Sequence, residues 1–182
     1  MVAHIIHDVN NKQRHDTLIE EIKTQGFEYT LWPHVKGPTP SINIVWAHKQ
    51  IIRYAIEQDM DSILIMEDDV AFTAPMAFDY FINNTPLEFD LYLAGIYSGR
   101  LKPDGTVNQF SSTHCYIVHS RFYEAFLMSD ETMQIDVGLS ALGGLYKVCM
   151  PMVAFQHPGF SENTGRVEDY SQRIKSYKKY GI

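Results

Sequence analysis

The sequence has 182 residues, 45% of them apolar and 20% charged, which suits one soluble globular domain and is short for two. A formal charge of -7 argues against broad adhesion to nucleic acid, although it does not exclude nucleic acid as a specific partner. No apolar run is long enough to span a membrane and Asp8 comes too early for a signal peptide, so we expect a cytoplasmic protein without a transmembrane segment.

The first half of the chain alternates between predicted strands and helices. Apolar runs predict strands within residues 2–9, 27–32, 62–72 and 89–94, and amphipathic patterns predict helices over 12–25, 42–58 and 75–83. Gly26 suits a left-handed helix end, and Ser41 suits a helix N-cap. Strands that alternate with helices predict an α/β domain with a mainly parallel, three-layer sheet and right-handed crossovers.

The second half has shorter elements. Residues 98–105 carry turn chemistry between two extended runs, which predicts a hairpin or a mobile flap whose Arg100 and Lys102 could face phosphate. The other patterns predict strands over 113–119 and 146–155, the latter interrupted at Pro151, and helices over 120–128, 135–142 and 168–180. Cys115 and Cys149 lie within apolar runs, so we expect buried free thiols in a reducing compartment.

The stretch from Ser62 to Phe72 is the strongest functional signal. Four apolar residues lead directly into Glu67, Asp68 and Asp69, and three more apolar residues follow. A buried strand thus delivers carboxylates to its own C-terminal end, where open α/β sheets bind ligands. Adjacent anions between apolar runs require a counter-charge, and Mn²⁺ or Mg²⁺ bound to the hard carboxylate oxygens would supply it. A strand followed by a solvated acidic turn is the alternative.

Several separated motifs occur in an order that resembles one enzyme family. They are Ile6-His7-Asp8 with Arg14, Ala47-His48 nineteen residues before Glu67, Met66-Glu67-Asp68-Asp69, Ser112-Thr113-His114-Cys115-Tyr116-Ile117, Asp136, and finally Pro151, Gln156, Ser161 and Glu162. Together they resemble glycosyltransferase family twenty-five, the lipooligosaccharide and collagen-type galactosyltransferases, over residues 3–166. The chain departs from the family at His7, Ala47 and Glu162, where the family has Asn, Ser and Asp, and it is short for a transferase of this fold.

The resemblance implies one GT-A-like, Rossmann-like domain over residues 1–182, in which residues 1–95 bind the nucleotide sugar and residues 96–182 bind the acceptor. It implies a hexosyltransferase that moves a sugar from a nucleotide diphosphate sugar, such as a UDP-hexose, to a hydroxyl group of a glycan or another acceptor. Lipooligosaccharide biosynthesis is the family setting. A metal that bridges two phosphate oxygens would neutralise the leaving group as the anomeric bond breaks.

The acidic motif and a late histidine would form the metal site. Asp69 is the principal ligand, and Glu67, two residues back on the same strand face, reaches the metal or the donor's ribose. Asp68 points to the other face, where it either contacts the donor or takes a backbone or cation partner. His157 would be the other metal ligand, as a late histidine is in many transferases of this fold, and its imidazole suits Mn²⁺ better than Mg²⁺. A solvated loop histidine is the alternative for His157.

Three further residues complete the predicted site. Arg14, just beyond the first strand, would bind the donor's phosphate or the rim of its base, and the alternative is an exposed helix arginine. His48 shares the apolar face of its helix, as core histidines do, and the resemblance alone places it in the donor site. Asp136 would act as the general base of an inverting reaction, whereas a helix N-cap is its structural alternative.

Two other functional classes fit parts of the pattern. A metal-dependent nucleotidyltransferase or phosphohydrolase would use the same acidic strand end, but the chain lacks a Gly-rich phosphate loop followed by Lys and a second carboxylate cluster. A non-catalytic relic that binds nucleotide sugars is suggested by the short length and by Ala47.

Overall fold

The computed structural model describes residues 1–161 and 164–170. Its helices are α1 (Lys12–Gln25), α2 (Pro40–Glu57), α3 (Ala77–Asn83), α4 (Tyr123–Leu127) and α5 (Ile135–Leu142), with a 3-10 turn η1 (Ser120–Phe122). Its strands are β1 (Ala3–His7), β2 (Tyr29–Pro33), β3 (Ser62–Glu67), β4 (Val70–Phe72), β5 (Leu91–Leu93), β6 (Ser98–Leu101), β7 (Val107–Ser111), β8 (Cys115–His119), β9 (Tyr146–Val148), β10 (Ala154–Gln156), β11 (Gly159–Ser161) and β12 (Arg166–Glu168).

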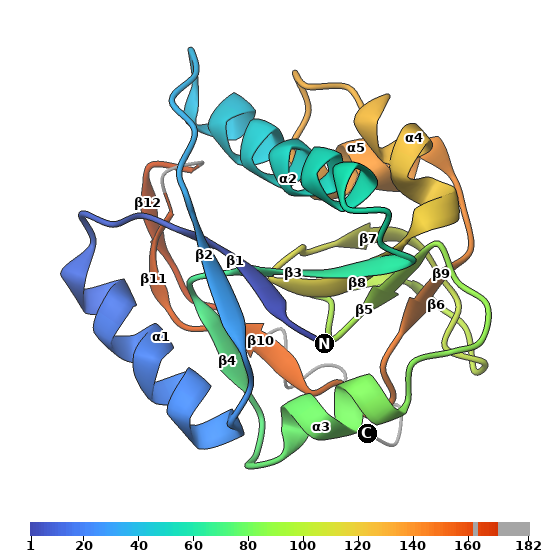
Figure 1. Cartoon of the computed structure of the whole chain (residues 1–182), viewed down its shortest axis with the longest axis horizontal. Helices are drawn as coiled ribbons and strands as arrows, with labels where there is room; N and C mark the ends of the chain where they lie inside the picture. Colours follow the sequence, from blue (N-terminus) through green and yellow to red (C-terminus); the bar gives the residue numbers. More distant parts are fainter. Residues whose placement is uncertain (162–163, 171–182) are drawn as a thin grey trace.

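A six-stranded sheet with the order β2-β1-β3-β8-β5-β9 forms the centre of the molecule (Figure 1). The β1–β2, β1–β3 and β5–β9 pairs are parallel, whereas β8 runs antiparallel to both of its neighbours, β3 and β5. The prediction of a mixed, mainly parallel α/β domain is therefore confirmed. The first three strands of the sheet share one direction, so their C-terminal ends meet at one edge of the sheet.

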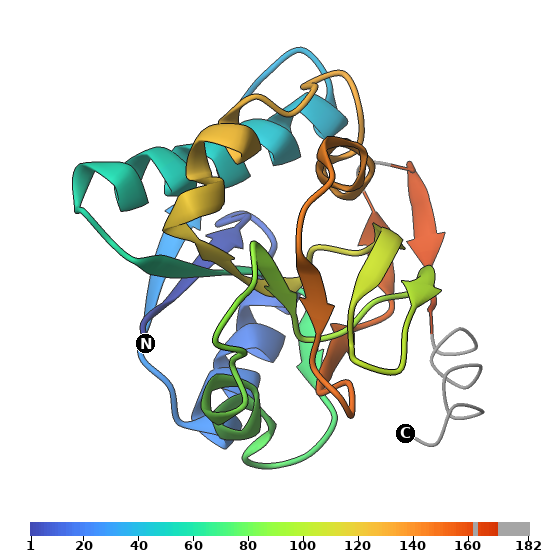
Figure 2. The ribbon, with the colours of Figure 1, turned by 90° about the vertical axis from the view of Figure 1, so that its right-hand side faces the viewer.

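Helices cover both faces of this sheet, as the view in Figure 2 shows with α2, α4 and α5 on one side and α1 and α3 on the other. The two faces of β3 explain its continuous apolar run. Ile63 and Ile65 pack in the core beneath α2, and Leu64 and Met66 pack in the core beside α1 and α3. A strand that is buried on both faces needs apolar residues at every position, because successive side chains point to opposite faces.

Local capping follows the sequence with one correction. Gly26 adopts a left-handed φ of 74° at the end of α1, as expected for a C-cap. The cap of α2 is Thr39 and not the predicted Ser41, because Pro40 opens the helix and the Thr39 side chain accepts a hydrogen bond from the Ile42 backbone nitrogen.

Two predicted strands are each broken in two. The predicted strand within 62–72 divides into β3 in the main sheet and β4, and the predicted strand over 146–155 divides into β9 and β10. The second halves of both pair with each other, since β10 runs antiparallel to β4 in a separate two-stranded sheet. Glu67, Asp68 and Asp69 consequently lie at the corner where the chain leaves one sheet for the other.

The hairpin predicted at 98–105 exists as β6 and β7, but its turn does not cover the carboxylates. The Val148 backbone nitrogen donates to the Gly105 carbonyl oxygen at 2.8 Å, and Thr106 pairs with Lys147. These contacts fix the turn against β9. The flap prediction is therefore corrected to a docked hairpin, and Arg100 and Lys102 do not line the cleft described below.

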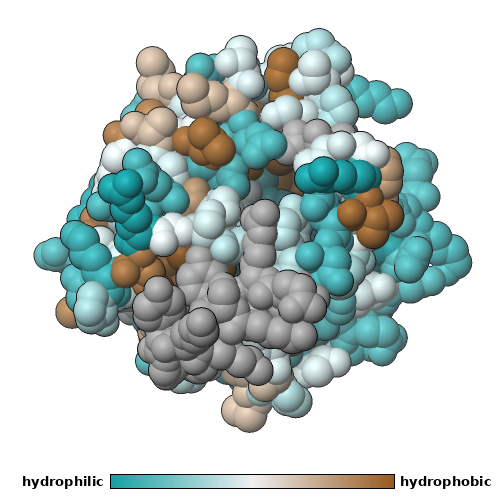
Figure 3. Space-filling view, turned by 180° about the vertical axis from the view of Figure 1, so that it is seen from behind, coloured by the Kyte–Doolittle hydropathy of each residue, from teal (hydrophilic) through white to brown (hydrophobic). Residues whose placement is uncertain are grey.

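The remaining observations concern the thiols, the C-terminal region and the surface. Cys115 and Cys149 are buried free thiols. The start of the helix predicted over 168–180 is wrong, because Glu168 belongs to β12. The rest of that prediction, from residue 171 on, lies outside the described residues, and so does Glu162. Within the described residues no helix is long and apolar enough to cross a membrane. The described part of the face in Figure 3 is largely hydrophilic, with apolar side chains in small scattered groups.

Candidate active site

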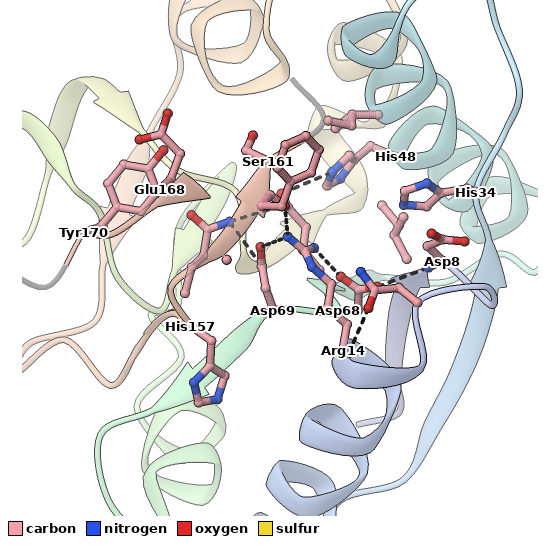
Figure 4. Close-up of a pocket in the computed structure, with 17 residues that line it drawn as sticks. Asp8, Arg14, His34, His48, Asp68, Asp69, His157, Ser161, Glu168 and Tyr170 are labelled. Atoms are coloured by element: carbon pink, nitrogen blue, oxygen red, sulfur yellow. Dashed lines mark hydrogen bonds and ion pairs between the residues drawn. The ribbon is translucent and has the colours of Figure 1, made fainter. Parts of the chain in front are cut away.

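A cleft opens beyond the C-terminal end of β3, and most of the predicted site residues line it (Figure 4). The acidic motif forms its floor. Arg14 reaches in from the first turn of α1, His48 lies on α2, and β10 brings residues 156 and 157 alongside. Residues from distant parts of the chain therefore meet at the edge of the sheet where α/β folds bind ligands.

Both carboxylate oxygens of Asp68 are occupied by contacts within the protein. Its side chain is 3% exposed, and its Oδ2 atom lies 3.0 Å from His7 Nδ1 and accepts from the Asp8 backbone nitrogen at 3.1 Å. Its Oδ1 atom accepts from Arg14 Nη1 at 2.7 Å. The structure thus supports the alternative in which Asp68 takes a cation and a backbone partner, because every oxygen already has a donor.

Arg14 supplies part of the counter-charge that the three carboxylates require. Its Nη2 atom lies 3.3 Å from Asp69 Oδ2 and donates to the Phe160 carbonyl oxygen at 2.9 Å. Burial lowers the pKa of Arg14, but the charges of Asp69 and Asp68 outweigh it and hold that pKa above its ordinary value. The exposed-arginine alternative is wrong, since Arg14 is 26% exposed and joins α1 to the acidic corner and to β11.

Glu67 is held in its ionised form. It accepts a hydrogen bond from Thr113 Oγ1 at 2.9 Å, and His48 Nε2 lies 3.5 Å from the same Oε1 atom. Burial alone raises the pKa of Glu67, but the contacts with His48 and Thr113 outweigh it and keep that pKa below its ordinary value. His48 is fully buried and its Nδ1 atom lies 2.7 Å from the Tyr116 hydroxyl, so it is a core histidine that also faces the cleft.

Asp69 is the least compensated of the three carboxylates. Burial first, and then the charge of Glu67, raise the pKa of Asp69 to about 7, although Arg14 opposes this shift. Its Oδ1 atom accepts from Gln156 Nε2 at 3.1 Å, and the same nitrogen donates to Glu67 Oε2 at 3.3 Å. A carboxyl group with this pKa exchanges its proton near neutral pH. Of the three carboxylates, Asp69 would be stabilised most by an incoming cation.

The structure does not bring the His157 ring to the acidic motif. Its Nε2 atom lies 3.3 Å from Glu21 Oε1 on α1, and the ring points away from Asp69 in Figure 4. The physical reason is strand alternation, because Gln156 and His157 are neighbours at the end of β10 and point to opposite sides. The side chain that reaches the acids is therefore Gln156, which the sequence marked only as a motif match.

Asp136 lies in an adjoining hollow lined also by Glu67 and Gln156. It is in the first turn of α5, where its carboxylate accepts from the backbone nitrogens of Ser112 at 2.9 Å and Val137 at 2.8 Å. The N-cap alternative is wrong, since Gln134 occupies the cap position. Burial raises the pKa of Asp136, and the two backbone hydrogen bonds oppose that shift.

Among the described residues, no three His, Cys, Asp or Glu side chains gather as a metal-binding cluster. The residues present still fit a hard cation, because two carboxylates, Glu67 and Asp69, converge on one amide nitrogen, and burial together with the charge of Glu67 raises the pKa of Asp69. Mg²⁺ and similar ions are commonly held by one or two carboxylates, with substrate phosphates as the other ligands. An open site of this kind is compatible with the geometry.

Comparison of the sequence with known families and with curated proteins found no match. The structure resembles A197 from STIV, at 14% identity and a TM-score of 0.58, with 91% of each chain covered. It resembles a mutant of β1,4-galactosyltransferase 7 from Drosophila in complex with manganese, UDP-Gal and xylobiose, at 10% identity and a TM-score of 0.52, with 94% of this chain and 72% of that chain covered. It also resembles a glycosyltransferase involved in glycosylation of the major capsid of PBCV-1, at 11% identity and a TM-score of 0.50, with 96% and 98% covered.

The chain has a GT-A-like fold. At these identities the similarity establishes the architecture alone, and the chemistry has to be argued from the site.

Proposed function

We propose that this protein is a metal-dependent glycosyltransferase that moves a sugar from a nucleotide diphosphate sugar to an acceptor hydroxyl. The observation that carries the proposal is the arrangement of charged residues along one cleft, with Arg14 and the acidic motif at one end and Asp136 at the other. Glu67 and Gln156 line both hollows, so the Arg14 end and the Asp136 end are continuous. The first end suits an anionic diphosphate with its cation, and the second offers a carboxylate to a hydroxyl group.

Asp69 and Glu67 would hold the Mn²⁺ or Mg²⁺ ion. When bound, the ion supplies Lewis-acid neutralisation of the departing diphosphate. Arg14, fixed by Asp68, adds a permanent positive charge beside it, and His48 keeps Glu67 ionised. The manganese and UDP-Gal in the Drosophila neighbour support a UDP-hexose as the first donor to test. His157 would join the ion only if its ring turned away from Glu21.

Asp136 would accept the proton of the acceptor hydroxyl in an inverting transfer. The Ser112 and Val137 backbone nitrogens fix the orientation of the carboxylate, and burial raises its pKa, which makes it a better proton acceptor than an exposed aspartate. The xylobiose in the Drosophila neighbour supports a glycan acceptor. We retain residues 1–95 as the main donor-binding half and 96–182 as the acceptor half, with Gln156 shared between them.

The finer assignment is to glycosyltransferase family twenty-five. The ordered motifs support it, because Arg14, His48, Glu67 and Asp69 meet in one cleft and Asp136 lies beside it. One departure has a structural consequence. His7, which replaces the family's Asn, points at Asp68 and helps to hold it, so this position stabilises the acidic corner.

The test is binding and turnover of nucleotide sugars. A matching UDP-hexose with Mn²⁺, at a hundred times its dissociation constant, should stabilise the wild type by about 2.7 kcal/mol, and Asp69→Asn should remove this metal-dependent gain. Slow release of free sugar and UDP without acceptor supports a transferase. Release of a nucleoside monophosphate instead would indicate a nucleotidyltransferase or phosphohydrolase, and binding without any cleavage, with or without acceptor glycans, would indicate a relic.

A further inference from the structure

The amide group of Gln156 occupies the position between two carboxylates. Its Nε2 atom donates to Asp69 Oδ1 at 3.1 Å and to Glu67 Oε2 at 3.3 Å. The remaining Asp69 oxygen, Oδ2, faces Arg14, and the remaining Glu67 oxygen, Oε1, faces Thr113. A positively polarised amide therefore lies where a cation that binds Asp69 Oδ1 and Glu67 Oε2 would lie.

Backbone contacts fix the position of Gln156, so the fold itself directs its side chain toward the two carboxylates. Gln156 pairs with Val70 in the β10–β4 ladder, and its backbone nitrogen donates to the Tyr97 hydroxyl at 2.6 Å. Alternation along β10 then directs Gln156 to the acids and His157 to Glu21. The residue placed to contact an ion between Asp69 and Glu67 is the glutamine.

We propose that Gln156 is the third protein ligand of the divalent cation, through Oε1, together with Asp69 and Glu67. The inference rests on the proposed metal-dependent function and extends it. Rotation about the last side-chain torsion exchanges Nε2 and Oε1, and this torsion has a broad, two-fold profile. The incoming ion replaces the hydrogen-bond donor between the two carboxylates, and the carbonyl oxygen turns toward it.

The charges balance in this arrangement. Asp68 is paired with Arg14, so the two negative charges of Asp69 and Glu67 match one divalent ion, and a neutral amide adds a ligand without adding charge. Carboxylate and carbonyl oxygens are hard ligands, which suit Mg²⁺ and Mn²⁺, whereas an imidazole would favour softer metals. Mn²⁺ and Mg²⁺ are therefore the ions that this ligand set suits.

The experiment measures Mn²⁺ affinity directly, by the electron paramagnetic resonance signal of free Mn²⁺, on the wild type, Gln156→Met and His157→Asn. Gln156→Met keeps the side-chain length without an oxygen, and its affinity should fall by at least about 10-fold. His157→Asn should keep an Mn²⁺ affinity within a factor of about two of the wild type, because the His157 ring faces Glu21 and not the two carboxylates. Gln156→Glu restores an oxygen at the same reach and should bind at least as tightly as the wild type.

Repetition at pH 8.5 separates ligation from a purely indirect effect. The Gln156 amide also lowers the pKa of Asp69, so a loss caused only by protonation of Asp69 would vanish at pH 8.5. A loss through a missing ligand persists there. Melting temperatures without metal establish that each variant folds, and if Gln156→Met does not, Gln156→Asn, which is one methylene shorter, should show the same persistent loss.

Three outcomes overturn the inference: wild-type affinity in Gln156→Met, a loss that disappears at pH 8.5, or a loss in His157→Asn that Gln156→Met does not share. In each of these the wild type still binds Mn²⁺, so the proposed metal dependence stands. If the wild type binds no divalent ion, the ligand assignment and the metal dependence fail together, and stabilisation by UDP-hexose without metal would then show whether donor binding survives.

Discussion

Asp69→Asn should make the metal-free protein more stable at pH 8, although it removes a residue of the active site. Asp69 lies at the crowded acidic corner, where burial first and the Glu67 charge second raise its pKa from 3.8 to about 7. That difference corresponds to at most about 4 kcal/mol of destabilisation by the ionised carboxylate at pH 8. Asparagine removes the charge while keeping the shape.

The realised gain is smaller than this upper bound. The pKa of about 7 already includes the favourable 3.3 Å ion pair with Arg14, but the Asp69 side chain is 12% exposed, so solvent screens part of the cost of its charge. We expect a net gain of roughly 1 to 2 kcal/mol, or about 2 to 8 °C in melting temperature for a chain of this size. Saturating Mn²⁺ should reverse the order, because the wild type gains binding energy and the variant does not.

The pH dependence gives the decisive control. The folded pKa of Asp69 lies above the unfolded value, so the stability of the metal-free protein falls as pH rises from about 4 through about 7. Calorimetric melting in EDTA should show the full Asp69→Asn gain at pH 8 and only roughly a third of it at pH 5, because the penalty grows between the unfolded and folded pKa values. Asp68→Asn should melt lower at both pH values, because Asp68 is 3% exposed and pairs with Arg14. An equal gain at both pH values, or a loss at pH 8, would refute the assignment of uncompensated charge to Asp69.

Three further changes test other parts of the site. Arg14→Met should lower the free energy of unfolding by roughly 2 to 4 kcal/mol in urea titration, because it leaves the buried Asp68 without its main cation; an unchanged midpoint would show that His7 suffices. Asp136→Asn should leave donor affinity by calorimetry unchanged while lowering single-turnover transfer about 10²–10⁴-fold, and a parallel loss of affinity would place it in the donor site. Gly95→Ala would drive a Cβ into the Ala154 carbonyl oxygen, so it should cost about 1 to 3 kcal/mol and weaken Mn²⁺ binding through displaced β10; wild-type Mn²⁺ affinity would contradict that coupling.

Much of the architecture could be predicted from local patterns. The apolar run before Glu67 is buried on both faces, which a period of two explains without tertiary information. Arg14 was predicted correctly at the cleft, because the first turn after β1 must lie near the C-terminal end of β3 in a parallel arrangement. The antiparallel direction of β8 could not be read, since strand direction depends on the connections and leaves no trace in composition.

The sequence predicted the His157 side chain beside the acidic motif, whereas the structure places the Gln156 side chain there. Two neighbouring polar residues at a strand end differ in direction by strand parity alone, and parity is fixed by the register of β10 on β4, where Gln156 pairs with Val70. That register depends on contacts between segments far apart in the chain. The partner of Asp68 was hidden for the same reason, because His7 lies 61 residues away.

Neighbouring side chains stabilise the charges of the three carboxylates to different degrees. This difference leaves Asp69 available to bind an ion. Asp68 is paired with Arg14, and Glu67 is kept ionised by His48. Asp69 shares Arg14 with Asp68 and accepts one amide hydrogen bond, and these contacts do not offset the burial and the Glu67 charge that raise its pKa to about 7. The metal-free cleft thus holds more negative charge than its own cations neutralise, at a cost to stability above neutral pH. A divalent ion would remove that cost on binding, so the repulsion that weakens the empty fold becomes part of the affinity for a cation that arrives with a diphosphate.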